Sequence, residues 1–83
     1  MNRKKIQIRL YRILRKLGVN REDICLNADL INDFGFDEFD SKIYLYYVET
    51  NFNINLPDYQ LPKLNNIKDT ISILEQNLLQ NSA

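Results

Sequence analysis

Histidine and tryptophan are absent from this sequence of 83 residues, and cysteine occurs once, as Cys25. The chain can therefore form no internal disulfide, no Cys/His zinc site and no Cys-His nucleophile pair. No apolar run approaches the roughly 18 residues that span a bilayer, and the basic start is not followed by the apolar stretch of a signal peptide. We expect a cytoplasmic protein without a metal, in which Cys25 is a small buried apolar side chain.

Acidic residues are also missing from the first quarter of the chain. Residues 1–21 contain eight bases and no acid, so this segment carries +8, and residues 22–83 carry −8. The net charge is zero. A separation of this kind can steer charged partners, and the alternative is that the two parts neutralise each other in the folded chain.

The length predicts one small domain over residues 1–83, with a modest core. Hydrophobic residues at 45% and charged residues at 27% are typical of a globular chain. No repeat, low-complexity tract or linker divides the sequence. We expect it to fold as a single unit.

The apolar spacing predicts a first helix over about residues 3–17. Gly18 and two bases in the last turn mark its end. Its apolar stripe consists of Ile6, Leu10, Ile13, Leu14 and Leu17. Its bases, which we expect on the opposite side of the helix, are Arg3, Lys4, Lys5, Arg9, Arg12, Arg15 and Lys16.

A long connection over residues 19–37 follows, with room for a turn near residues 28–33. Its scattered apolar anchors are Val19, Ile24, Leu26, Leu30, Ile31, Phe34 and Phe36. Asp37 is a suitable N-cap for a second helix that reaches about Asn51. Six consecutive apolar or aromatic residues, 43–48, predict that this helix is covered on more than one side. The same run is also compatible with a buried strand.

Two prolines, Pro57 and Pro62, bracket a segment that is long enough only for a single short helix. Asn66, with Asp69 three residues later, predicts the N-cap of a last helix that ends near Leu79. The expected fold is all-α.

Three local patterns resemble the acyl carrier protein family. Residues 33–40, Asp-Phe-Gly-Phe-Asp-Glu-Phe-Asp, are similar to the family's Asp-Leu-Gly-x-Asp-Ser-Leu, with loop positions Asp33, Gly35, Asp37 and Phe39. Residues 52–58 resemble Phe-Gly-Ile-x-Ile-Pro-Asp, and residues 66–71 resemble Thr-Val-x-Asp-Ala-Ile. The resemblance implies a small four-helix bundle with three long helices, a short third helix and a long first loop.

In that family the serine of the loop carries 4'-phosphopantetheine, but here the matching position holds Glu38. The family has 14 positions from this serine to the phenylalanine that ends the second helix and 19 to the next proline. Here, 14 positions before Phe52 and 19 positions before Pro57 both give residue 38. A carboxylate cannot hold the phosphodiester arm, so we expect no cofactor on Glu38, whose acid also suits a helix start.

Ser41 is the alternative attachment residue, because Asp40-Ser41 restores an Asp-Ser pair. Three residues along a helix shift the position by about 4.5 Å, and Lys42 follows in place of the family's apolar residue. The alternative to modification is an ordinary exposed serine.

The resemblance also implies a partner surface on the second helix, which is acidic in the family. The matching positions here are more apolar, and we expect a protein-binding surface built from Asp40, Lys42, Ile43, Tyr46 and Glu49. The alternative is that the aromatic residues only fill the core.

These features give three functional hypotheses. The first is a non-catalytic protein-binding module without the arm, whose partners could include biosynthetic enzymes. The second is a working acyl or aminoacyl carrier for fatty-acid, polyketide or related biosynthesis, modified at Ser41. The third uses the basic helix to bind anionic lipid or nucleic acid, but no aromatic platform accompanies it and its apolar stripe is needed for the core. We expect no enzyme and no nucleic-acid partner, and the sequence leaves the oligomeric state open.

Overall fold

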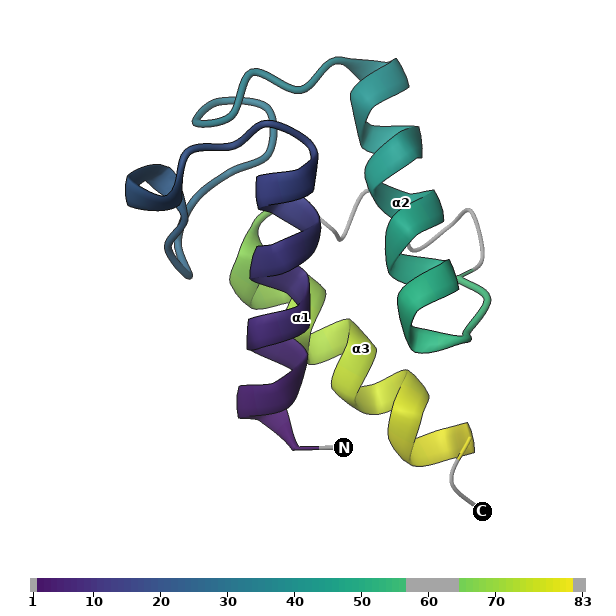
Figure 1. The fold of residues 1–83 in the computed structure, drawn as a ribbon. Helices are drawn as coiled ribbons and strands as arrows, with labels where there is room; N and C mark the ends of the chain where they lie inside the picture. Colours follow the sequence, from purple (N-terminus) through teal and green to yellow (C-terminus); the bar gives the residue numbers. More distant parts are fainter. Residues whose placement is uncertain (1, 57–64, 82–83) are drawn as a thin grey trace.

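The described part of the chain, residues 2–56 and 65–81 of a computed structural model, is all-α (Figure 1). Its elements are α1 (Arg3–Lys16), the short 3-10 helix η1 (Arg21–Asp23), α2 (Glu38–Phe52) and α3 (Ile67–Asn81). The three long helices confirm the predicted layout. The strand alternative for residues 43–48 is wrong, because all six residues lie within α2. The short helix predicted between Pro57 and Pro62 lies outside the described residues.

Helix α1 has one apolar stripe, as the spacing predicts. Four residues of the stripe are buried, while Leu17 at its end is partly buried and packs against the core. The Asn2 side chain caps the start by accepting a hydrogen bond from the Lys5 backbone N–H at 2.9 Å. The helix ends where Gly18 adopts a left-handed φ of 97°, which favours glycine.

The core lies where α1 packs against both α2 and α3. Helix α2 contributes Tyr44, Val48 and Phe52. Helix α3 contributes Ile67, Ile71 and Leu74, none of which is exposed to solvent. The long loop adds Ile24, Ala28, Leu30 and Phe36. The loop that carries these four residues lies at the end of the bundle where α1 ends and α2 begins (Figure 1).

The loop is tied to the start of α3 by backbone hydrogen bonds. Leu30 N–H donates to the Asn65 carbonyl at 2.9 Å, and Lys68 N–H donates to the Leu26 carbonyl at 2.9 Å. The Asn66 side chain accepts from Asp69 N–H at 2.8 Å, which confirms the predicted N-cap of α3. A segment distant in sequence therefore fixes the loop that precedes α2.

Three side chains of the loop differ from expectation. Cys25 is exposed, so its prediction as a buried apolar side chain is wrong. Leu26 and Ile31, expected as apolar anchors, are also exposed. In this irregular segment the buried Ile24, Ala28 and Leu30 fill the space under the loop, and the side chains between them turn outward.

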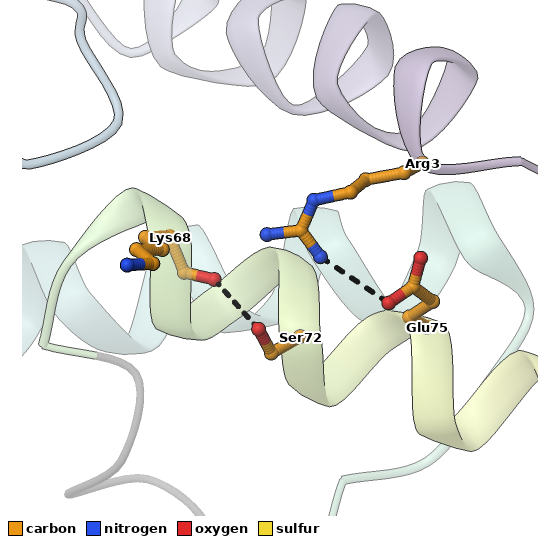
Figure 2. Close-up of polar contacts among 4 residues, drawn as sticks. All are labelled: Arg3, Lys68, Ser72 and Glu75. Carbon is orange, nitrogen blue, oxygen red and sulfur yellow. Dashed lines mark hydrogen bonds and ion pairs between the residues drawn. The ribbon is translucent and has the colours of Figure 1, made fainter.

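One ion pair joins α1 to α3. The Arg3 guanidinium lies 3.2 Å from the Glu75 carboxylate, and Figure 2 shows the two side chains meeting between the helices. Along α3, the Ser72 hydroxyl donates to the Lys68 carbonyl at 3.2 Å (Figure 2). Both ends of the ion pair are partly exposed, so it contributes at most about 1 kcal/mol.

Candidate functional site

The loop before α2 is held by its own carboxylates. Asp33 accepts a hydrogen bond from the Asp29 backbone N–H at 2.6 Å, while the Asp29 carboxylate accepts from the N–H groups of Ile31 and Asn32. The predicted turn thus forms around residues 29–34. Gly35 then adopts a φ of 70°, a conformation that disfavours other residues and turns the chain toward α2.

Asp37 and Asp40 form a reciprocal capping box at the start of α2. Asp40 N–H donates to the Asp37 carboxylate at 2.8 Å, and Asp37 N–H donates to the Asp40 carboxylate at 3.2 Å. This arrangement satisfies two backbone donors that the helix leaves unpaired. It confirms Asp37 as the N-cap and gives Asp40 a structural role.

Glu38 is the first residue of α2, and its side chain is 87% exposed. Its carboxylate lies 3.6 Å from the Lys42 ammonium, one turn along the helix. The neighbouring Phe39 ring is 69% exposed. A shallow depression on the surface is lined by Asp37, Glu38, Phe39 and Lys42. An exposed carboxylate thus stands at the tip of α2.

Ser41 lies on the side of α2 that faces the core. It precedes Tyr44, Val48 and Phe52 at helical spacings of three, seven and eleven residues, and these three residues are buried. Ser41 is itself partly buried, and its backbone N–H donates to the Asp37 carbonyl at 3.0 Å. Its hydroxyl is therefore less accessible than the side chain of Glu38.

A second apolar stripe runs along the outer face of α2. Phe39, Ile43 and Tyr46 follow one another at spacings of four and three residues, on the side opposite the buried stripe. Tyr46 is 65% exposed and Ile43 is partly exposed. Aromatic and aliphatic side chains left in water on one helix face mark a candidate protein contact.

The five residues predicted for partner binding do not share one face. Ile43 and Tyr46 lie on the outer stripe of α2, with Lys42 beside it in the ion pair with Glu38. Asp40 belongs to the capping box. The Glu49 carboxylate accepts the Leu56 backbone N–H at 2.8 Å, so it holds the chain after the helix. Sequence reasoning placed Phe39 only in the loop motif, although its four-residue spacing to Ile43 was a signal for the stripe.

The basic residues of α1 are exposed, as their face of the helix predicts. Three of them contact other elements. Arg3 pairs with Glu75, Arg9 lies 5.9 Å from the centre of the Phe52 ring, and the Lys16 ammonium lies 5.4 Å from the centre of the Tyr47 ring. The remaining four bases of the face are Lys4, Lys5, Arg12 and Arg15.

Tyr44 brings a phenol into the core. Its side chain is 1% exposed, and its hydroxyl has no hydrogen-bond partner among the residues that the structure describes. Burial raises the pKa of Tyr44, and the nearby Thr70 hydroxyl opposes this rise only in part. Thr70 donates its own hydrogen bond to the Asn66 carbonyl at 2.9 Å. The Tyr44 phenol is therefore uncharged at neutral pH and has no partner within residues 2–56 and 65–81.

Carboxylates also line a hollow of about 330 Å³ between the loop and the end of α1, where Asp23, Asp33 and Asp40 meet Val19 and Phe36. Within residues 2–56 and 65–81, no group of three acidic or cysteine side chains is placed to hold a metal ion. The hollow offers no nucleophile with an adjacent base.

The chain is similar over most of its length to curated acyl carrier proteins. The protein from Helicobacter acinonychis is 31% identical over 67 residues, which cover 81% of this chain and 86% of the relative. The protein from Akkermansia muciniphila is 31% identical over 64 residues, or 77% and 80% of the two chains. The protein from Porphyromonas gingivalis is 30% identical over 66 residues, or 80% and 85%.

This chain belongs to the acyl carrier protein family. No protein-family profile matches it. The relatives are named as carriers and not as enzymes.

The arm that the family resemblance implies does not fit residue 38. An acyl carrier protein of the usual pattern offers a serine hydroxyl there, whereas Glu38 offers an exposed carboxylate beside Lys42. A phosphate joined to a carboxylate is a mixed anhydride, which water cleaves. Residue 38, the attachment position that the family spacing predicts, therefore offers no hydroxyl for the phosphodiester of the arm.

Proposed function

We propose that this acyl carrier protein-family domain acts as a non-catalytic binding module without a prosthetic arm. It would dock on protein partners in the cytoplasm, biosynthetic enzymes among them. The observation that carries the proposal is Glu38, the first residue of α2, which stands within the capping box formed by Asp37 and Asp40.

The outer stripe of α2 is the surface that we assign to docking. Phe39 and Tyr46 are mostly exposed, and the core is closed without them by the buried stripe of the same helix. Burying an exposed aromatic ring in a partner groove yields about 25 cal/mol per Å² of apolar surface removed from water. The stripe therefore has apolar area to offer a partner and no visible role in the fold.

Mass spectrometry tests the absence of the arm. The chain would be expressed together with a phosphopantetheinyl transferase of broad specificity, as the wild type and as Glu38→Ser. We expect the wild type to keep its unmodified mass and Glu38→Ser to gain one phosphopantetheine, because the restored hydroxyl stands at the exposed helix tip. Glu38→Ser thus serves as the control that the loop is still recognised.

Affinity capture from the source cells tests the docking surface. We expect Phe39→Ser with Tyr46→Ser to lose the proteins that the wild type retains. Ile8→Ser is the matched control for partners other than a second copy of this chain, because Ile8 is an exposed apolar residue of α1 outside the outer stripe. If the wild type and both variants captured the same proteins, the assignment of docking to the outer stripe of α2 would be wrong.

A working carrier modified at Ser41 is the second candidate. It is favoured by the relatives, which are named acyl carrier proteins and match about four fifths of the chain. The partly buried position of Ser41 on the core side of α2 weighs against it. If the wild type gained a phosphopantetheine that Ser41→Ala lost, the second candidate would replace the first.

A further inference from the structure

The charges of residues 1–40 fall into two adjoining blocks of opposite sign. Residues 1–21 hold eight bases and no acid, and residues 22–40 hold seven acids and no base. Within the described residues, the ion pairs are Arg3 with Glu75 and Lys42 with Glu38. No base of the first block therefore pairs with an acid of the second, and folding leaves the two blocks largely unneutralised.

The outer face of α1 concentrates the positive charge. Lys4, Lys5, Arg12 and Arg15 surround Ile8 on the side opposite the buried stripe, at about 3.6 residues per turn. All four bases are exposed and form no ion pair with any residue that the structure describes, and Ile8 is 44% exposed. We call these five residues the basic face.

The negative charge lies at the end of the bundle where α1 ends and α2 begins (Figure 1). Glu22, Asp23 and Glu38 are exposed there and make no backbone cap. Exposed apolar side chains accompany them, with Ile31 at 62% and Phe39 at 69%. We call residues 22–40 the acidic end.

The two surfaces match each other in charge and in composition. Each combines several charges of one sign with exposed apolar side chains, and they lie on different parts of the same chain. Because the net charge is zero, two copies do not repel each other as whole molecules at neutral pH. We propose that the basic face of one copy binds the acidic end of a second copy, head to tail.

Other occupants fit the basic face less well. A nucleic acid would leave Ile8 without a partner and finds no exposed aromatic ring among the five residues on which to stack a base. A membrane would gain little from one partly exposed isoleucine. The proposal does not depend on whether the chain carries an arm.

Sedimentation velocity of the intact chain tests the proposal. A head-to-tail contact uses two different surfaces and stays open at both ends. We therefore expect the average mass of the wild type to rise with concentration at about 0.01 M salt, where charges act over about 30 Å. At about 1 M salt, where the range is about 3 Å, the association is expected to be lost.

Two complementary variants identify the surfaces. Lys4→Gln with Arg12→Gln and Arg15→Gln removes the basic face, and Glu22→Gln with Asp23→Asn and Glu38→Gln weakens the acidic end. We expect each variant alone to remain monomeric, and an equimolar mixture to form a complex of two chains that cannot grow. Circular dichroism would show that both variants remain helical.

A monomeric wild type at every concentration in low salt would overturn the proposal. It would also fail if the wild type associated and the mixed variants did not. Binding of a short RNA or of anionic vesicles through the basic face at about 0.15 M salt, without self-association, would assign the face to those ligands instead. Tyr46→Ser separates this contact from docking through α2, since it should leave self-association unchanged.

Discussion

Helices α1 and α2 both pack against the core, but they expose different surfaces to solvent. Helix α1 buries a single apolar stripe and presents charge elsewhere, with Ile8 as its exposed aliphatic residue. Helix α2 buries Tyr44, Val48 and Phe52, yet it also keeps Phe39 and Tyr46 in water. One stripe is enough to join a helix to a small core. The second stripe of α2 is therefore surplus to folding, which is why we assign it to a partner.

The largest expected effect on stability comes from comparing a phenylalanine on the buried stripe of α2 with one on the outer stripe. Phe52→Ala removes a ring that is 5% exposed, and we expect a loss of about 3–5 kcal/mol in the free energy of unfolding. Phe39→Ala removes a ring that is mostly exposed, and we expect less than about 0.5 kcal/mol. Urea unfolding followed by circular dichroism measures both. Similar losses would show that the outer stripe supports the fold.

The next comparison is the corresponding pair in α1. Leu10 is fully buried, so Leu10→Ala should lower the free energy of unfolding by about 2–5 kcal/mol. Ile8→Ala on the basic face should cost less than about 0.5 kcal/mol. Thermal unfolding of both variants at one protein concentration checks this. A loss of stability in Ile8→Ala as large as that in Leu10→Ala would mean that α1 is packed on two sides.

The helix starts give a smaller contrast. Asp37 at α2 is half of a reciprocal capping box, whereas Asn2 at α1 accepts one backbone N–H and no acid follows in the first turn. We expect Asp37→Ala to lower the free energy of unfolding by about 1–2 kcal/mol and Asn2→Ala by about 0.5 kcal/mol. The urea midpoints of the two variants show which substitution lowers the stability more. The reverse order would show that the box contributes little.

The smallest expected effect has the opposite sign. Tyr44→Phe removes a buried hydroxyl that has no hydrogen-bond partner among the described residues, so we expect a gain of about 1 kcal/mol at neutral pH. Because burial raises the pKa of Tyr44 above its ordinary value of 10.0, the unfolded chain ionises first in alkali. The wild type should therefore lose stability as the pH rises above about 10, and this contribution should be absent from Tyr44→Phe. Urea unfolding of both chains at neutral and alkaline pH measures the difference. The same loss of stability with pH in the wild type and in Tyr44→Phe would contradict the raised pKa of Tyr44.

The regular elements were predictable because each one carries its own local signals. The stripe of α1, Gly18 after its end, and the N-caps Asp37 and Asn66 are short-range patterns, and the structure confirms them. Burial in the loop was harder to predict, because the side chains of an irregular segment follow no regular spacing. Cys25 and Leu26 were expected inside and lie outside, since which loop side chains fill the core depends on contacts with α3.

The sequence by itself determined the helices and the family pattern, because chain order and spacing record both, and its spacing predicts Glu38 at the family's serine position. Tertiary structure alone decided which polar groups are available. It turned Glu49 toward the Leu56 backbone and Tyr44 into the core, and it left the basic face of α1 without ion pairs among the described residues. The burial of Tyr44 and the exposure of the basic face depend on elements remote in sequence, and the Glu49 contact depends on the path of the chain after α2, so no local pattern encodes them.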